Sequence, residues 1–407
     1  MRNNLTKCIN NGVILGADKY SDQYGIIADN AETKIALDLN HPNTISLFGV
    51  QGGGKSYTLG AISEMALMKI PGINHLEQPL ASVIFHYSAT EDYSPEFCSM
   101  INPNPDAYQV EKLRSVYGAE PRCLNDVVML TSEDKVDERK IEYPGIDMYP
   151  LKFSSKKLHA SHWKFLMGAV GNNSVYLRQL TQIIRNHRDK LTLEILREEI
   201  YNSEMADTIV ELAQMRLDFA EQYIDDEFDL GSLLKPGRLI IVDIRDELIE
   251  KDEALGLFVV LLNLFSETKF ENQAFNKIII FDECHKYIDN PDMVTGLIEA
   301  VREMRHRATS VIIASQDPLS VPLALIELSS IIFLHKFNSP NWLKHIQQSN
   351  TALKGLTPEM MNTMSAGEAY VWASKSSEIN YTRQPYKIKC RPRVTKHGGD
   401  SLLATRR

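Results

Sequence analysis

Short apolar runs alternate along this chain with segments in which apolar residues recur at helical spacing. Most of the runs are apolar at nearly every position, which is typical of strands buried on both faces. The clearest are residues 44–48, 81–87, 127–130, 238–243, 277–283, 310–316, 330–337 and 369–373. Buried strands separated by helices predict an α/β fold, with a mainly parallel sheet covered by helices on both faces.

A long helical segment interrupts this alternation. Between about residues 158 and 228 the apolar positions follow helical periodicity beside long polar faces, most clearly over 175–188, 191–201 and 206–223. The predicted units are a β lead-in (1–43), a first core part (44–157), an α-helical insertion (158–232), a second core part (233–375) and a basic tail (376–407). The arginines of the insertion, Arg178, Arg185, Arg188 and Arg197, form either a basic stripe or part of a solvated helix face.

The two ends of the chain differ from the core. Residues 1–43 contain short apolar runs at 13–15, 24–28 and 34–39, and we expect small strands there, packed beside the strand at 44–48. From Tyr386 onward the chain is basic, which is typical of a disordered tail or of a segment that docks on a neighbouring subunit or on DNA. The basic residues are Lys387, Lys389, Arg391, Arg393, Lys396, Arg406 and Arg407.

A phosphate-binding pattern follows the first core strand, because residues 49–56 match GxxxxGKS. Its glycines leave backbone N–H groups free to surround an anion, Lys55 can reach the β and γ phosphates of ATP, and Ser56 can bind Mg2+. The helix predicted over 57–68 would point its N-terminus at the phosphates. The predicted nucleotide contacts are Gly49, Gly52, Gly53, Gly54, Lys55, Ser56 and Tyr57.

A second motif is acidic: Asp282 and Glu283 end the run KIIIFDE at residues 277–283. Four apolar residues place Asp282 at the carboxyl end of a buried strand, where it can complete the Mg2+ shell through water. The adjacent Glu283 can polarise the water that attacks the γ phosphate. A glutamate directly after the aspartate favours a motor-type ATPase over a kinase.

Further polar residues are candidates for the same reaction. Gln316 ends the strand SVIIASQ, so its amide can sense the γ phosphate at the edge of the sheet where ligands collect. Arginine is suited to neutralise charge on a transferred phosphoryl group. In VREMRHRATS, Arg302 and Arg305 share a helix face, and we expect one of them to act on the ATP of a neighbouring subunit; Arg307 is a third candidate.

The composition limits the possible functions. The 407 residues carry a net charge of −9, which argues against a generally basic surface that coats nucleic acid but permits a local basic channel. The five cysteines form no CxxC pair, so we predict neither a disulfide framework nor a zinc site and expect a reducing cytoplasm. No stretch reaches about 18 uninterrupted apolar residues, so no membrane span is predicted.

Taken together, the motifs resemble the HerA/FtsK class of P-loop ATPases, and the HerA branch most closely. The resemblance covers roughly residues 40–375 and is carried by GVQGGGKSYT, LKPGRLIIVD, IIIFDECHKY, VREMRHRATSVIIASQDP, IIFLHKFNSP and SAGEAYVW. Its specific part is their order: DE with a nearby histidine, then RExR, a strand ending in glutamine, and a GEAxVW-like strand.

This resemblance implies a RecA-like P-loop NTPase core, a hexameric ring and ATP-driven translocation on double-stranded DNA. It implies that Lys55 and Ser56 bind phosphate and Mg2+, that Asp282 and Glu283 form the Walker B pair, that Arg305 or Arg302 is a finger acting in trans, and that Gln316 is the sensor. HerA-type motors frequently work beside a nuclease or another effector, so such a partner is implied as well, for instance in defence against foreign DNA.

The chain also departs from the HerA branch. Members usually carry an N-terminal β-barrel domain, for which residues 1–43 leave little room. An acidic residue often follows the second core strand directly, whereas here FHYSATED makes Glu91 or Asp92 the nearest equivalent. A second reading therefore stays open: a ring scaffold, controlled by ATP, that assembles a partner effector without being a DNA motor itself.

Overall fold

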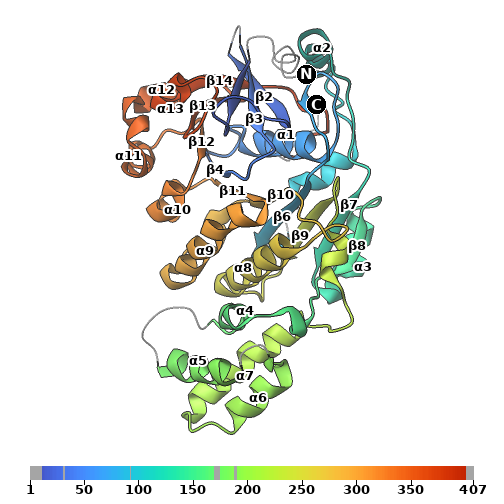
Figure 1. Cartoon of the computed structure of the whole chain (residues 1–407), viewed down its shortest axis with the longest axis vertical. Coiled ribbons are helices and arrows are strands. Elements are labelled where there is room, and N and C mark those ends of the chain that lie inside the picture. Colours follow the sequence, from blue (N-terminus) through green and yellow to red (C-terminus); the bar gives the residue numbers. More distant parts are fainter. Residues whose placement is uncertain (1–11, 31–32, 92, 169–174, 188–189, 400–407) are drawn as a thin grey trace.

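One mixed sheet, mostly parallel, runs through the molecule (Figure 1). The computed structural model describes residues 12–30, 33–91, 93–168, 175–187 and 190–399. Its strands are β1 (Val13–Leu15), β2 (Tyr24–Asn30), β3 (Thr33–Asp38), β4 (Thr44–Phe48), β5 (Asn74–His75), β6 (Ala81–Ser88), β7 (Val127–Thr131), β8 (Asp147–Pro150), β9 (Leu239–Arg245), β10 (Lys277–Phe281), β11 (Thr309–Ser315), β12 (Ile331–His335), β13 (Glu368–Ala373) and β14 (Tyr386–Cys390). The strands lie in the order β1-β3-β2-β14-β13-β12-β4-β11-β10-β6-β9-β7-β8, and β5 pairs with β2.

The described helices cover both faces of this sheet. They are α1 (Lys55–Leu67), α2 (Ala107–Lys112), α3 (Val136–Glu142), α4 (Ala160–Leu166), α5 (Val175–His187), α6 (Leu193–Tyr201), α7 (Asp207–Glu221), α8 (Lys251–Glu267), α9 (Pro291–Met304), α10 (Leu323–Glu327), α11 (Pro340–Ser349), α12 (Pro358–Asn362) and α13 (Asn380–Arg383). The α/β fold with buried parallel strands that the sequence predicts is confirmed.

The centre of the sheet is parallel from β12 through β4, β11, β10, β6 and β9 to β7. Successive residues of a strand face opposite sides, so each central strand feeds two cores. Leu47 belongs to the core that contains Leu59 of α1, whereas Phe48 belongs to the core that contains Phe258 of α8 and Leu297 of α9. Because both faces are covered, these strands are apolar at almost every position.

Strands β1 to β3 form the lead-in, but their predicted place is wrong. The neighbours of β4 are β11 and β12, and the lead-in joins the sheet at its far end through β14, which pairs antiparallel with β2 and β13. The prediction failed because the strand that bridges the lead-in to the core comes from the other end of the chain, which local sequence patterns do not reveal.

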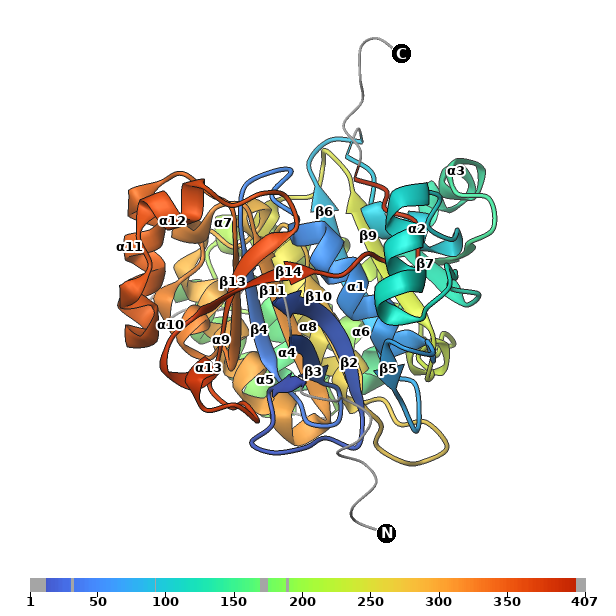
Figure 2. The ribbon, with the colours of Figure 1, turned by 90° about the horizontal axis from the view of Figure 1, so that it is seen from above.

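Within the described residues, the segment from Tyr386 onward is neither a disordered tail nor a segment left free for a neighbour. Residues 386–390 form β14, and Arg391 and Arg393 are buried. Residues 391–397, which we call the C-terminal strap, continue along α1 toward α2, and Figure 2 shows this dark red segment beside α1. Arg406 and Arg407 lie outside the described residues.

Helices α4 to α7 form the predicted helical segment, and α5 to α7 lie at the end of the molecule farthest from β2 and β3 in Figure 1. Helix α4 packs against α8 and so joins this segment to the core. The basic stripe is not supported: Arg197 pairs with Asp218 and Glu221 of α7, and Arg188 lies outside the described residues. Arg178 and Arg185 are exposed.

Across the part of the chain that the structure describes, no helix is both long and apolar enough to cross a lipid bilayer.

Candidate nucleotide-binding site

The predicted phosphate clamp lies between the carboxyl end of β4 and the start of α1. Gly52 and Gly54 have φ angles of +73° and +107°, a region that residues with a side chain rarely adopt. A Cβ atom at Gly49 would lie 2.6 Å from the Cβ of His335. Within the described residues no side chain caps the start of α1, so its first N–H groups can bind phosphate oxygens.

Lys55 and Glu283 form a buried ion pair at this edge of the sheet. The Lys55 Nζ donates a hydrogen bond of 3.1 Å to Glu283 Oε1, and the two side chains are only 3% and 2% exposed. Burial raises the pKa of Glu283, but the charge of Lys55, the side-chain hydrogen bonds of Gln316 and Lys55 and the charge of His285 together outweigh burial, so the pKa of this carboxyl lies below its ordinary value. The fold thus joins two motifs that are 228 residues apart in the sequence.

Asp282 lies directly after β10 and is almost fully buried. Burial, followed by the charge of Glu283, raises the pKa of Asp282 above its ordinary value. Its Oδ1 accepts the N–H of Glu283 at 3.0 Å. A buried carboxylate with a raised pKa is stabilised in its charged form by a nearby cation, so Asp282 has the character expected of a metal ligand.

The residues present fit a Mg2+ ion held mainly by nucleotide and water. Mg2+ prefers oxygen ligands and usually keeps several waters, with one or two protein ligands; Ser56 and Asp282 supply a hydroxyl and a carboxylate. No group of three or more His, Cys, Asp or Glu residues that could hold a metal is present among the described residues. In addition, Glu283 Oε2 is buried there without a hydrogen-bond partner, which leaves an acceptor for a water.

Gln316 follows β11, the strand that lies between β4 and β10 in the sheet. Its backbone N–H donates to His285 Nδ1 at 3.4 Å, and that nitrogen is 3.5 Å from Glu283 Oε2. The side-chain amide of Gln316 is among the groups near Glu283 that lower the pKa of its carboxyl. Burial lowers the pKa of His285, so this imidazole is neutral at pH 7. The structure therefore brings Gln316 close to Glu283.

Sequence reasoning missed His335, which forms the wall behind the clamp. Its Nδ1 donates to the carbonyl of Glu368 at 3.0 Å, and its Nε2 accepts the hydroxyl of Thr58 at 3.1 Å. Burial lowers the pKa of His335 to about 4, so the ring is neutral at pH 7. The one available signal was its place near the carboxyl end of the predicted strand 330–337, at the edge of the sheet where the other site residues lie; in the structure His335 is the last residue of β12.

The loop after β6 covers the same edge. Tyr93 lies in this loop; its carbonyl accepts a hydrogen bond of 2.8 Å from His86 Nε2, and the Lys286 ammonium lies 3.5 Å from the centre of its ring. Glu91, one of the two acidic residues proposed for the site, is instead paired with Lys135 and Arg139 at 2.8 and 2.5 Å. Asp92 lies outside the described residues.

Tyr57 was predicted to contact the nucleotide, but its side chain is engaged elsewhere. Its hydroxyl donates to Gln109 Oε1 and accepts the backbone N–H of Arg393, both at 2.7 Å. Burial raises the pKa of Tyr57 to about 12. A contact between Tyr57 and phosphate would therefore use its backbone N–H.

The arginine candidates lie at the opposite edge of the sheet. Helix α9 ends at Met304, and Arg305 precedes β11, so Arg302 and Arg305 are near the amino end of a strand whose carboxyl end faces the clamp. Both side chains are exposed. Arg307 is held by Glu267 and Glu303 at 2.8 and 3.1 Å. Within one chain the structure brings none of them to Lys55.

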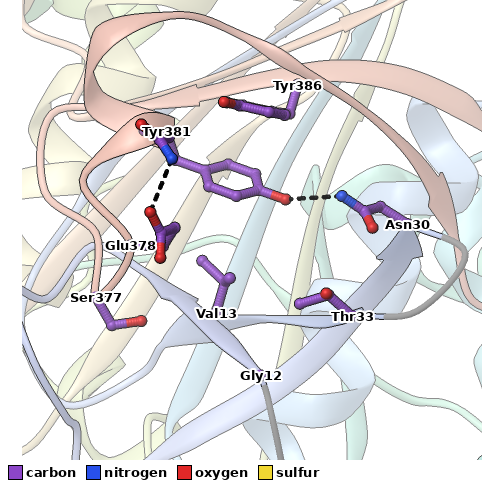
Figure 3. A pocket seen from close by; sticks show the side chains of 9 residues that line it. Gly12, Val13, Asn30, Thr33, Ser377, Glu378, Tyr381 and Tyr386 are labelled. Atoms are coloured by element: carbon purple, nitrogen blue, oxygen red, sulfur yellow. Dashed lines mark hydrogen bonds between the residues drawn. The ribbon is translucent and has the colours of Figure 1, made fainter.

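The pocket drawn in Figure 3 lies apart from the clamp. It has a volume of about 330 Å³ and is lined by residues of the lead-in, by residues between β13 and β14, and by Tyr386 of β14. Asn30 donates to the hydroxyl of Tyr381, whose ring stacks on Tyr386. Strands β12, β13 and β14 separate the lead-in from β4, so this pocket is not part of the nucleotide site.

Comparison with known proteins finds solved structures with a similar fold. The sequence matches none of the protein-family models and none of the curated proteins with which it was compared. The fold is similar to VirB4 of Thermoanaerobacter pseudethanolicus, with 12% identity, coverage of 92% of this chain and 97% of that chain, and a TM-score of 0.58. It is also similar to the bacterial conjugative coupling protein TrwB, with 12% identity, coverage of 88% and 87%, and a TM-score of 0.53.

The chain has the fold of the RecA-like P-loop ATPases. TrwB is also known in complex with a non-hydrolysable GTP analogue, and that structure covers 89% of this chain at 12% identity with a TM-score of 0.52. The expected RecA-like core is confirmed, and the similarity to VirB4 and TrwB is a similarity of fold.

Proposed function

We propose that this protein is a Mg2+-dependent ATP hydrolase whose site is built from Lys55, Ser56, Asp282 and Glu283. The observation that carries the proposal is the buried contact between Lys55 and Glu283, at the edge where the glycine turn and the N-terminus of α1 also lie. A turnover site for a nucleoside triphosphate requires a phosphate clamp, a metal carboxylate and a residue that orients water. Candidates for all three follow β4 and β10, the two strands on either side of β11 in the sheet.

Each side chain has a distinct role in this proposal. The N–H groups of the clamp and the Lys55 ammonium bind the β and γ phosphates, and Ser56 and Asp282 hold the Mg2+ ion, which neutralises phosphate charge. Glu283 orients the attacking water, and Gln316 senses the γ phosphate from beside Glu283. Because Arg302 and Arg305 are exposed at the far edge of the sheet, one of them would act on the ATP of a neighbouring subunit.

The work that ATP hydrolysis drives is, in our proposal, translocation on double-stranded DNA by a hexameric ring. The HerA-like order of motifs supports it, as does the similarity in fold to TrwB, a conjugative coupling protein. The ring would work beside a nuclease or another effector, in DNA processing or in defence against foreign DNA. An ATP-controlled scaffold is the second candidate: the chain carries a net charge of −9, and Arg197 of the insertion is paired with acidic residues.

Steady-state ATPase assays separate these two functions. For a motor, duplex DNA should stimulate turnover, and native mass measurement with ATP and duplex DNA should show a hexamer. An ATP turnover rate that duplex DNA does not change, but that a protein partner increases, would favour the scaffold. Lys55→Ala should abolish nucleotide binding in either case, because it removes the charge that faces the phosphates; binding at the level of the native protein would refute the site itself.

A further inference from the structure

The C-terminal strap, residues 391–397, lies directly on the helix that begins at the phosphate clamp. Burying a carboxylate is costly unless its oxygens are paired, and Glu64 of α1 is 0% exposed. Four donors satisfy it, all from the strap: Arg391 Nη1 at 2.6 Å, the backbone N–H groups of Val394 and Thr395 at 3.0 Å, and the Thr395 hydroxyl at 2.7 Å. The sequence of α1 is thus built to receive the strap.

Arg393 brings the strap into contact with the middle of α1. A Cβ atom at Gly60 would lie 2.3 Å from the Cζ of Arg393, so the guanidinium occupies the space that a side chain there would fill. The same guanidinium donates to Glu96 Oε1 at 2.7 Å and to the carbonyl of Lys396 at 2.9 Å. Arg393 is therefore fixed on three sides and cannot shift without disturbing α1.

The strap also reaches the residue next to the predicted Mg2+ ligand Ser56. The backbone N–H of Arg393 donates to the Tyr57 hydroxyl at 2.7 Å, and the ring of His397 lies edge-on to the Tyr57 ring with 5.3 Å between their centres. Just before the strap, Cys390 Sγ is 3.1 Å from the Thr58 hydroxyl. The contacts therefore begin in the first turn of α1, where phosphate would bind.

We propose that the strap positions the phosphate clamp, and that Arg393 is a positioning residue for nucleotide binding through Tyr57 and α1. The inference rests on the proposed ATP site. A helix N-terminus binds phosphate well only when its N–H groups are held at the right place, and the strap holds this helix along its length. ATP binding and docking of the strap would stabilise the same arrangement of α1, and two such events must favour each other. Docking of the strap therefore strengthens ATP binding, and bound ATP holds the strap more firmly on α1.

The test measures the dissociation constant of a fluorescent, non-hydrolysable ATP analogue with Mg2+ for the full chain. Tyr57→Phe removes the hydroxyl that accepts the Arg393 N–H and donates to Gln109, and Arg393→Ala removes the guanidinium. Each should raise the dissociation constant, by about tenfold for Arg393→Ala, a difference of about 1.4 kcal/mol; Arg393→Lys should restore part of the loss. Lys396→Ala is the matched control, because Lys396 is an exposed residue of the same strap, and it should bind like the native protein.

Two further measurements test whether the role of the strap is purely structural: hydrogen exchange of the strap amides, and nucleotide binding by a variant that is destabilised far from the strap. The amides of Arg393, Val394 and Thr395 should exchange more slowly when the analogue binds the native protein, but not when it is added to Lys55→Ala. Leu217→Ala removes a buried side chain of α7 and should lower stability without changing the dissociation constant.

The outcomes separate this inference from the proposed function. Nucleotide binding within twofold of the native value in both Tyr57→Phe and Arg393→Ala, with strap amides unaffected by the analogue, would overturn the inference and leave the ATP site intact. If Arg393→Ala does not fold, Tyr57→Phe and the exchange of the strap amides decide the matter. Absence of nucleotide binding by the native protein would overturn the site and the inference together.

Discussion

Lys55 donates its hydrogen bond to Glu283 in a site that is nearly closed to water. The charge that would bind the phosphates is therefore neutralised by the carboxylate that would orient the attacking water. In the proposed ATP site, phosphate would take Lys55 away from Glu283, and this exchange would free Glu283 to orient water. Nucleotide binding would then prepare the site for hydrolysis.

Replacing Glu283 by Gln should separate binding from turnover. The change removes a carboxylate that competes with phosphate for Lys55, so affinity for ATP should be kept or increased. Turnover should fall by about 10²-fold or more, because the group that activates water is lost. Equilibrium binding and steady-state ATPase assays on the same preparation check both. Glu299→Gln, an exposed change on α9, should alter neither; full ATPase activity in Glu283→Gln would contradict the catalytic assignment.

Replacing Gly60 by Ala should destabilise the protein although alanine favours helix. The new Cβ would lie 2.3 Å from the Cζ of Arg393, so either the strap or α1 must shift, at a cost of about 1–3 kcal/mol. Chemical denaturation measures the loss. Gly355→Ala is the control, because no atom lies within 4 Å of a Cβ at that position; equal stability of the two variants would argue against tight packing of the strap on α1.

The burial of His335 predicts how the stability of the protein depends on pH. Burial lowers the pKa of His335 to about 4 from an ordinary value of 6.5, so between these values the unfolded chain binds a proton that the folded chain does not. The free energy of unfolding should therefore fall as the pH drops from 6.5 to 4, by about 1.4 kcal/mol per pH unit from this residue. Above pH 6.5 the contribution is constant and fully present.

Denaturation of His335→Gln across this pH range isolates the effect. His162 also has a pKa lowered to about 4 by burial. Both histidines should therefore contribute to the loss of stability of the native protein as the pH drops from 6.5 to 4. Between pH 4 and 6.5 the free energy of unfolding of His335→Gln should change less steeply with pH than that of the native protein. The difference should be about 1.4 kcal/mol per pH unit, the contribution of one proton. His162→Gln should give a similar reduction while leaving the wall of the clamp intact. An unchanged slope in His335→Gln would show that this ring is protonated in the folded protein.

Arg305 tests whether the site is shared between subunits. Arg305→Ala and Lys55→Ala should each have little ATPase activity, because one lacks the arginine and the other lacks the clamp. Mixing the two proteins should recover part of the activity, since some interfaces then combine an intact Arg305 with an intact Lys55. Arg307 is held by Glu267 and Glu303 in its own chain, so Arg307→Ala should stay active without mixing. No recovery in the first mixture would count against an arginine acting in trans.

The sequence by itself determined the parts whose signals are local. Strands buried on both faces must be apolar throughout, so the α/β class and the central strands were readable from hydrophobic runs. The glycines of the clamp and the acidic pair at Asp282 and Glu283 were readable because a phosphate turn and a metal carboxylate each need particular residue types at fixed positions relative to a strand.

Only the tertiary structure decided which distant segments meet. The same basic composition suits a free tail and a buried strap, and what distinguishes them is Glu64, a carboxylate 327 residues away from Arg391 in the chain. His335 likewise gains its place from the packing of β12 beside β4. Local sequence patterns contain no signal for such pairs, because the free energy that orders them comes from burying partners that are separated by most of the chain.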